Sequence, residues 1–367
     1  MKKKMIKSSI CAIFCVLLLF PPLYPPFEAA EVPSVSAQSA VLYQPDTGLF
    51  PIEKAADTPL PMASTTKIMT ALTVLRLLSP NDTVSVAKEA VGIEGSSAYL
   101  HEGERLSVKD LLYALLLQSA NDAAVALAIH ACGTVEAFVA EMNALAADLG
   151  LKNTCFQNPH GLPDDGHFTT ARELALITEA AMQEPLFKGI VSTKVYRVTT
   201  SERELVFANH NKLLRFSEDA IGVKTGFTKD SGRCLVGAAE RDGVCFISVT
   251  LNAPSDWRDH QEMWEYGFSR FEKREILSAE EYTKNILVFG AIKPYVTVTN
   301  REAFSAVLPK GASLRLIPEV LPLPALPIVE GQVLGKLAIC LNEKRIATLS
   351  LYASESLSPL SERKLFH

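Results

Sequence analysis

Ser64 and Lys67 stand three residues apart at the start of a long apolar segment, residues 68–78. Residues at this spacing lie on one face of a helix, so the hydroxyl and the amine are expected within side-chain reach of each other. A helix that is apolar nearly all round is buried inside a protein. Burial lowers the pKa of a lysine from about 10.4 towards the range in which its amine accepts a proton from a serine. The pattern therefore predicts a nucleophile with its base.

The same four-residue pattern occurs again at Ser361 and Lys364. This second copy lies in a short polar tail with no apolar helix behind it. We therefore give catalytic weight only to the first copy.

A second polar motif, Ser119-Ala120-Asn121, separates two apolar helical segments at 107–117 and 122–129. Ser107 is expected to cap the first helix, and Gly133 to end the second. Polar groups in a break between buried helices either cap the helices or point into a cleft, and we favour the cleft. Ser79-Pro80-Asn81 repeats the motif, but in a loop without helices around it.

The third motif, Lys224-Thr225-Gly226, opens a strand predicted at 220–226. Glycine removes a side chain where a substrate backbone could lie against the strand edge. Lys224 and Thr225 then offer a cation and a hydroxyl to a carboxylate. The alternative is an edge strand with a solvated lysine.

The three motifs occur in the order found in serine β-lactamases and penicillin-binding proteins. Between about Ser39 and Ala353 the chain resembles the D-alanyl-D-alanine carboxypeptidases, the low-molecular-mass penicillin-binding proteins that trim peptidoglycan stem peptides. The resemblance implies a serine-type carboxypeptidase that removes the terminal D-alanine through an acyl-enzyme on Ser64. It also implies β-lactam antibiotics as covalent inhibitors, and no cofactor or metal.

The resemblance implies a role for each motif residue. Lys67 would accept the proton of Ser64, Ser119 would relay a proton to the leaving amine, and Asn121 would hold the substrate amide or steady Lys67. Lys224, Thr225 and Gly226 would bind the substrate, with Lys224 also keeping Lys67 neutral. The oxyanion hole would be the backbone amides of Ser64 and Phe227.

Three histidines lie in segments that match the family without obvious chemistry. His160 and His167 fit no zinc spacing, so we expect structural hydrogen bonds from them rather than metal ligation. Some relatives carry arginine at the position of His210, which leaves a substrate-binding role of this residue open.

The first thirty residues predict export. Four lysines precede an apolar run at 10–20, and Pro21-Pro22 ends it, which is typical of a signal peptide. Cleavage after Ala30 is favoured over cleavage after Ala37, and the enzyme is then expected outside the cytoplasm, in the cell wall or on the outer face of the membrane. Processing takes away four of 36 Lys and Arg and one of 41 Asp and Glu, leaving a formal net charge of −8. An acidic chain without a basic stripe is not expected to bind nucleic acid.

Five cysteines remain after processing, mostly in apolar settings. An odd number of this kind predicts buried thiols rather than a disulfide framework. Cys234 and Cys245 flank a hairpin expected to turn at 241–243, but not directly opposite each other.

The resemblance implies an α+β fold. An antiparallel sheet flanked by helices and an all-helical lobe over 64–180 would form the catalytic domain, residues 31–275, with the site between the lobes. Predicted strands at 220–226, 232–240 and 244–251 precede a helix capped by Ser255. Short alternating runs after residue 280 predict a β-sandwich at 280–357. The tail at 358–367 is too polar for a strong membrane anchor.

Two other functions fit the motifs. A β-lactamase of class A adds a glutamate that activates water, and we find no convincing equivalent between residues 150 and 180. A non-catalytic sensor of β-lactams or cell-wall peptides would acylate and stop, and turnover distinguishes it from an enzyme.

Overall fold

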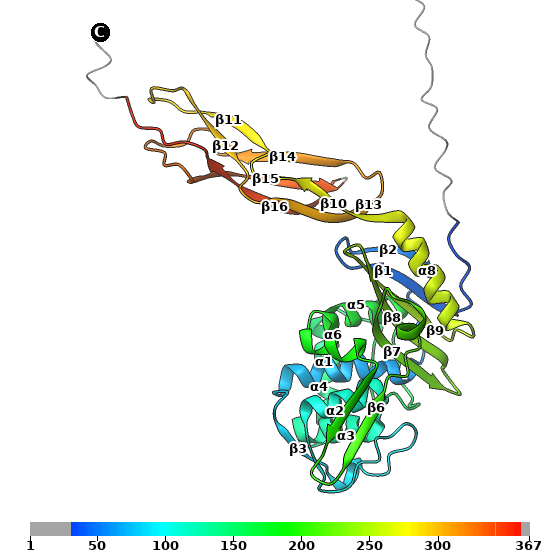
Figure 1. The fold of residues 1–367 in the computed structure, drawn as a ribbon. Coiled ribbons are helices and arrows are strands. Elements are labelled where there is room, and N and C mark those ends of the chain that lie inside the picture. The colour runs from blue at the N-terminus through cyan, green and yellow to red at the C-terminus, as the bar shows by residue number, and fades with distance from the viewer. Residues whose placement is uncertain (1–30, 342, 361–367) are drawn as a thin grey trace, which may run out of the picture. The chain divides into compact units, whose positions relative to one another are not determined.

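The computed structural model describes residues 31–360 except residue 342. The expected signal peptide at 1–30 and the second Ser-x-x-Lys pattern lie outside the described residues, as does most of the polar tail. Between residue 31 and the end of helix α8 (Asp256–Arg270), the centre of the structure is a five-stranded antiparallel sheet with strand order β2-β1-β9-β8-β7 (Figure 1). Its strands are β1 (Ser39–Gln44), β2 (Leu49–Lys54), β7 (Ala220–Thr228), β8 (Gly232–Arg241) and β9 (Val244–Leu251).

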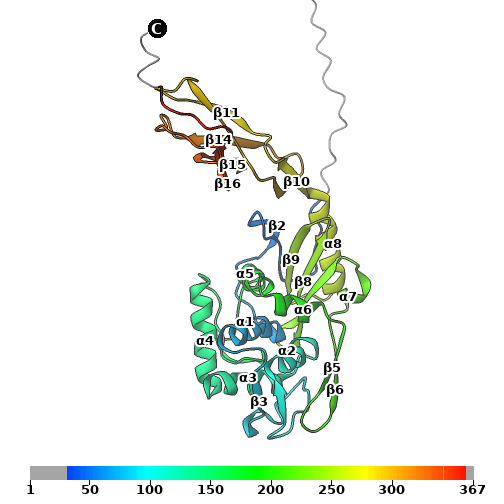
Figure 2. The same ribbon diagram turned by 60° about the vertical axis from the view of Figure 1, so that its left-hand side comes forward.

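Helices cover both faces of this sheet. Figure 2 shows α8 on one face and the other long helices on the opposite face. The helices are α1 (Lys67–Leu77), α2 (Val108–Leu117), α3 (Asn121–Cys132), α4 (Val135–Asp148), α5 (Ala171–Met182), α6 (Pro185–Ser192), α7 (Leu213–Phe216) and α8 (Asp256–Arg270). The sheet flanked by helices confirms the predicted fold class.

Local sequence signals explain the helix ends that lie near the motifs. Ser107 and Asp110 form a reciprocal capping box at the start of α2, and Gly133 ends α3 with a φ of 80°. Both ends were predicted. Helix α1 is buried from Lys67 to Val74, as its apolar sequence predicts. Ser64 precedes α1 in a 3₁₀ turn, Ala63–Thr66, rather than in the α-helix itself.

The strands near the third motif differ in detail from the prediction. Lys224-Thr225-Gly226 lies in the middle of the nine-residue strand β7, not at its start, because pairing with β8 continues to Thr228. β7 is an edge strand, as both interpretations of the motif assumed, but Lys224 is buried rather than solvated. β8 and β9 turn at Asp242-Gly243, both with positive φ, and Cys245 pairs with Glu240, so Cys234 is not opposite it. All five cysteines of the described residues are free thiols.

Helix α8 packs on the sheet through Trp264 and Phe268, which are buried with Phe246. Ser255 occupies the predicted cap position, but its side chain makes no capping bond. Instead Asp256 at the first helical position accepts from the backbone amide of Trp257. Phe271 directly follows the helix and begins strand β10.

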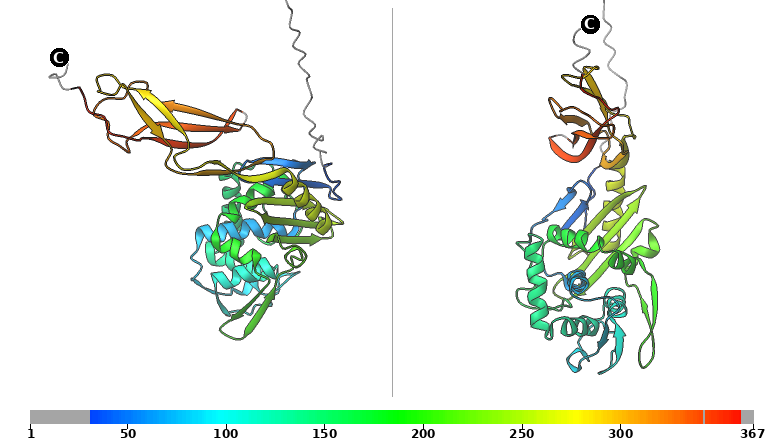
Figure 3. Two further views of the ribbon diagram at one scale, coloured as in Figure 1. Left: turned by 45° about the horizontal axis from the view of Figure 1, so that its top comes forward. Right: turned by 90° about the vertical axis from the view of Figure 1, so that its left-hand side faces the viewer.

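The helical lobe also contains strands, since β3 (Thr83–Ser85) pairs with β4 (Arg105–Ser107). A longer hairpin of β5 (Val195–Thr199) and β6 (Glu204–Ala208) follows α6 and contacts α2 (Figure 3). A short 3₁₀ helix, Lys88–Ala90, completes this region. Among the described residues no single helix is long and apolar enough to cross a bilayer, while α3 and α4 pass that test only as a pair bent by 86°.

Every element after α8 in the described residues is a strand. Five of them form a sheet in the order β11-β12-β16-β15-β14, and β10 pairs with β13. The strands are β10 (Phe271–Leu277), β11 (Thr283–Leu287), β12 (Tyr295–Thr299), β13 (Phe304–Pro309), β14 (Leu314–Val320), β15 (Val333–Leu341) and β16 (Lys344–Ala353). The all-β prediction is confirmed. The expected domain end at residue 275 falls inside β10, whose hydrogen-bonding partner is the later strand β13.

Candidate active site

Lys67 lies at the centre of a buried hydrogen-bond cluster. Its amine is 3.0 Å from Ser64 Oγ and 2.7 Å from Asn121 Oδ1, and it also donates to the backbone oxygen of His160 at 2.6 Å. Ser64 is half-buried and lines a pocket, whereas Lys67 has no exposed surface. The first and second motifs therefore meet at one amine.

Burial holds the pKa of Lys67 well below its ordinary value, and the neighbouring ammonium of Lys224 lowers it further. A neutral amine has two N–H donors and one lone pair. Asn121 Oδ1 and the His160 oxygen can accept those two hydrogens, which leaves the lone pair directed at the Ser64 hydroxyl. The cluster thus suits a lysine that accepts a proton from Ser64.

The amide of Asn121 has a fixed orientation. Its nitrogen donates to the backbone oxygen of Glu94, so its oxygen faces Lys67. The next residue, Asp122, is buried and accepts from the Ser97 hydroxyl at 2.6 Å and from the Ala98 amide at 3.0 Å. Asp122 therefore anchors the loop that orients Asn121.

The segment between α4 and α5, residues 149–170 and here called the His160 loop, presents the backbone oxygen of His160 to Lys67. Asn158 Oδ1 accepts from the Gly161 amide at 2.7 Å, and the Thr70 hydroxyl donates to the Pro159 oxygen at 2.6 Å. Gly161 has a φ of +88°, and an added Cβ would lie 2.0 Å from the Ala63 oxygen. Only glycine fits this contact between the loop and the turn that carries Ser64.

Ser119 stands in the break between α2 and α3, as predicted. Its φ of 62° is in the left-handed region, where a residue other than glycine is strained. The residue is 4% exposed and lines the same pocket as Ser64. The polar break thus faces a cleft.

The third motif reaches this cleft from β7. Lys224 is 1% exposed, donates to the Thr225 oxygen at 2.8 Å, and has its pKa lowered to about 7 by burial. A Cβ on Gly226 would come within 3.0 Å of the Ser64 backbone nitrogen. A side chain at this position would therefore crowd the Ser64 turn, and glycine allows the close approach of β7, a reason that the sequence interpretation did not give.

The pocket itself has a volume of about 340 Å³. Its walls combine some of the predicted residues with several that sequence reasoning did not select, whereas the predicted Lys67, Asn121 and Lys224 do not line it. They are Ser64, Ser96, Ser119, His210, Lys212, Thr225, Gly226, Phe227, Arg233, Cys234, Asp256 and Trp257.

The sequence profile of the D-alanyl-D-alanine carboxypeptidases matches residues 27–255, more than half of the chain. The chain belongs to this family. A second profile, of the C-terminal domain of penicillin-binding protein 5, matches residues 271–358.

Individual members of the family can be aligned with this chain over most of its length. The D-alanyl-D-alanine carboxypeptidase DacC of Escherichia coli is 33% identical over 361 residues, 93% of this chain and 89% of that protein. DacF of Bacillus subtilis is 29% identical over 333 residues, 88% of this chain and 86% of that protein. The crystal structure of penicillin-binding protein 5 from Haemophilus influenzae has a TM-score of 0.68 at 29% identity, covering 89% and 98% of the two chains.

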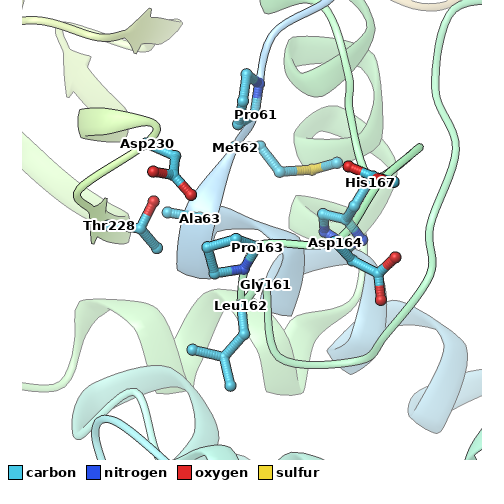
Figure 4. Close-up of a pocket in the computed structure, with 11 residues that line it drawn as sticks. Pro61, Met62, Ala63, Gly161, Leu162, Pro163, Asp164, His167, Thr228 and Asp230 are labelled. Atoms are coloured by element: carbon cyan, nitrogen blue, oxygen red, sulfur yellow. The ribbon is translucent and has the colours of Figure 1, made fainter.

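A second pocket, of about 450 Å³, adjoins the active-site cleft of this family member (Figure 4). Thr228 and Asp230, from the end of β7 and the turn after it, lie on one side of Ala63. Leu162 and Asp164 of the His160 loop line the pocket from the other side. The pocket therefore lies beside Ala63, the residue before Ser64, and next to the C-terminal end of β7.

Both histidines of the loop have hydrogen-bond partners within it, as the sequence predicted. His167 Nε2 is 2.8 Å from the Thr66 hydroxyl, and its Nδ1 accepts from the Gln157 amide at 3.0 Å. Because the Thr66 hydroxyl itself donates to a backbone oxygen, Nε2 carries the proton. Burial lowers the pKa of His167 to about 4 and that of His160 to about 3, so both rings are neutral at pH 7.

Sequence reasoning missed two features of the site. The oxygen that His160 offers to Lys67 is a backbone atom, so the residue type at position 160 gives no indication of this contact. Arg233 and Asp256 pair at 2.7 Å beside the cleft, and the only sequence signal was their position in the segments that flank the third motif. Among the predicted residues the structure brings together Ser64, Lys67, Ser119, Asn121, Thr225 and Gly226, with Phe227 at the rim.

Proposed function

We propose that this protein hydrolyses the bond between the two D-alanines that end peptidoglycan stem pentapeptides. The observation that carries the proposal is the buried Lys67 amine, which lies 3.0 Å from Ser64 Oγ with two of its hydrogens taken up by other oxygens. Such an amine activates a serine without histidine or metal. Family membership supplies the substrate class, since the related proteins are named D-alanyl-D-alanine carboxypeptidases.

Two steps complete the reaction. Ser64 Oγ attacks the carbonyl carbon of the penultimate D-alanine while its proton passes to Lys67. The C–N bond breaks, the leaving nitrogen takes a proton through Ser119, and free D-alanine departs. Water then attacks the ester on Ser64, releases the shortened peptide and restores the hydroxyl.

The backbone stabilises the negative charge on the carbonyl oxygen. The amides of Ser64 and Phe227 serve as oxyanion donors, and the close approach of Gly226 to the Ser64 nitrogen brings these two segments together. The substrate lies extended along the open edge of β7, with its carboxylate near Thr225 and Lys224. Its acyl part then points towards Thr228 and the adjoining pocket.

Peptidoglycan lies outside the cytoplasmic membrane, so the enzyme works after export through the signal peptide at 1–30. Cleavage after Ala30 fits the structure better than cleavage after Ala37. Val35 and Ala37 are buried beside α8, and the Ser36 hydroxyl donates to Asp259 at 2.6 Å. A cut after Ala37 would remove all three.

We further propose a catalytic domain at 31–275 and a C-terminal β domain at 280–357 that leaves the chemistry unchanged. Its strands enclose a separate hydrophobic core around Leu337, Ile339 and Leu351. Removal of residues 280–367 that preserves acylation of Ser64 supports this division, whereas loss of acylation shows that the β domain is needed for folding.

β-Lactams inhibit the enzyme rather than serve as its substrates. Glu173, in the first turn of α5 after the His160 loop, accepts from the backbone amides of Lys152 and Asn153 and from the Thr154 hydroxyl. The second glutamate of α5, Glu179, accepts from the Tyr43 hydroxyl at 2.8 Å. Both carboxylates are thus occupied by structural contacts. Among the described residues of this segment, no glutamate is therefore available to activate water, which is the feature that would favour a β-lactamase.

D-alanine release from Nα,Nε-diacetyl-Lys-D-Ala-D-Ala, measured on the chain without residues 1–30, tests the function. We expect release by the wild type and none by Ser64→Ala. Penicillin labelling without D-alanine release would instead support a sensor, and the absence of both would refute the proposed chemistry.

A further inference from the structure

Arg233 stands at the edge of the active-site cleft on the strand next to β7. In the antiparallel register Thr225 pairs with Leu235, and Phe227 pairs with Arg233. Directly paired residues share a face of the sheet, so Arg233 is the diagonal neighbour of Thr225 on one face. Residues in that relation are about 7–8 Å apart, within the reach of an arginine side chain. Both residues line the cleft that contains Ser64.

The guanidinium is held in place from α8. Arg233 Nη2 donates to Asp256 Oδ1 at 2.7 Å, and the Trp257 ring lies 5.7 Å below the guanidinium carbon. The Asp256 side chain is only 5% exposed, whereas that of Arg233 is 43% exposed. Asp256 therefore orients the arginine from the protein side, and a guanidinium with five N–H donors keeps further donors for the cleft.

The cleft needs a cation for the carboxylate that ends the substrate. Lys224 is buried, its pKa is lowered to about 7, and its amine donates to a backbone oxygen. Lys212, another lysine of the cleft, is exposed and forms no ion pair among the described residues. Arg233 differs from both because it is always charged, accessible and fixed by an ion pair.

We propose that Arg233 binds the carboxylate of the terminal D-alanine, together with the Thr225 hydroxyl, and so makes the enzyme specific for a free C-terminus. Asp256 is then a positioning residue. The inference rests on the proposed function for the identity of the substrate. It assigns carboxylate recognition to a residue of β8 as well as to the Lys-Thr-Gly strand.

Two acyl donors separate carboxylate binding from any structural role. One is the diacetylated Lys-D-Ala-D-Ala peptide, which ends in a carboxylate. The other is the 4-nitrophenyl ester of N-acetyl-D-alanine, which acylates Ser64 with loss of 4-nitrophenolate and has no carboxylate. Arg233→Gln is expected to lower kcat/KM for the peptide about 10- to 100-fold, mainly through KM, because a charge-assisted hydrogen bond is lost. Acylation by the ester should change less than about two-fold.

Further variants complete the test. Arg258→Gln removes the same charge from the start of α8, where Arg258 pairs with Glu262 at the surface, and should leave both donors unaffected. Arg233→Lys should recover only part of the peptide activity because an ammonium lacks the planar fork. Asp256→Asn should raise KM for the peptide and leave the ester rate unchanged.

An equal loss on both donors with Arg233→Gln would overturn the inference, and so would an unchanged KM for the peptide. If the wild type released no D-alanine but was labelled by penicillin, the proposed function would fail. The inference would then be decided by labelling rates, because penicillin carries a carboxylate and the ester does not.

Discussion

The amine of Lys67 lies 2.7 Å from Asn121 Oδ1, and this contact exists because the Asn121 nitrogen is already committed to the Glu94 oxygen. A neutral amide takes one hydrogen from the lysine without adding charge. The same geometry with a carboxylate would favour the ammonium form. The second motif therefore influences the protonation of the first.

Asn121→Asp is expected to raise the pKa of Lys67 and to move the acidic limb of the kcat profile to higher pH by about one unit or more. On the acidic limb of the profile, the rate of D-alanine release at a given pH should fall about ten-fold for each unit by which the pKa of Lys67 rises. The measurement is kcat against pH for the tripeptide. Asn143→Asp is the matched control, since Asn143 bonds to backbone groups of α4 and of Phe156 far from Lys67. An unshifted acidic limb in Asn121→Asp would contradict the prediction.

Gly161→Ala should abolish acylation and lower the Tm, because its Cβ would overlap the Ala63 oxygen next to Ser64. Gly103→Ala provides the control for backbone strain alone. Gly103 has a φ of +79°, close to that of Gly161, but an added Cβ there meets nothing within 4 Å. Its cost is limited to about 1–2 kcal/mol from the left-handed conformation. Penicillin labelling and thermal unfolding measure both effects, and equal losses in the two variants would rule out the clash.

The parts of the site that depend on neighbours in the sequence were predictable. The spacing of Ser64 and Lys67 places both on one turn, and the caps at Ser107 and Gly133 define the break that holds Ser119. The role of the His160 loop was not predictable, because it contributes a backbone oxygen whose position depends on tertiary packing. Arg233 was missed for a related reason: strand register, which no local pattern fixes, brings it beside Thr225.

Burial of Lys224 makes stability depend on pH. Its pKa is about 7 in the folded protein and near 10.5 in an unfolded chain, so unfolding takes up a proton between these values. Stability therefore rises with pH from about 7 to 10 on account of this residue. Lys224→Met should raise the Tm at pH 7 by about 2–4 °C, and this gain should shrink towards pH 10. Lys212→Met, at an exposed site of the same cleft, should show no such trend. A constant Tm difference for Lys224→Met would contradict the argument.

Ser36 connects the N-terminal segment to α8 through the buried carboxylate of Asp259. Ser36→Ala removes the hydroxyl donor from a charged group without exposed surface, which is expected to cost about 1–3 kcal/mol. Ser192→Ala removes an exposed hydroxyl that donates to the Gly189 oxygen and should have little effect. Urea denaturation of both variants measures the difference. A chain that begins at Gln38 should lose at least as much stability as Ser36→Ala. If chains that begin at residues 31 and 38 were equally stable, the argument against cleavage after Ala37 would fail.

The acyl-enzyme formed with penicillin should outlast the one formed with the peptide. In the peptide reaction D-alanine departs and leaves room for water at the ester on Ser64. The amine released from a β-lactam stays attached to the acyl group, and the Glu173 carboxylate that could otherwise activate water is held by backbone amides.

Glu173→Gln should therefore lower the Tm while leaving recovery from penicillin unchanged. Asp164→Asn tests the carboxylate of the adjoining pocket in the same way. Recovery is followed as the return of D-alanine release after excess penicillin is removed, and a slower return in either variant would identify a deacylating base and favour a β-lactamase.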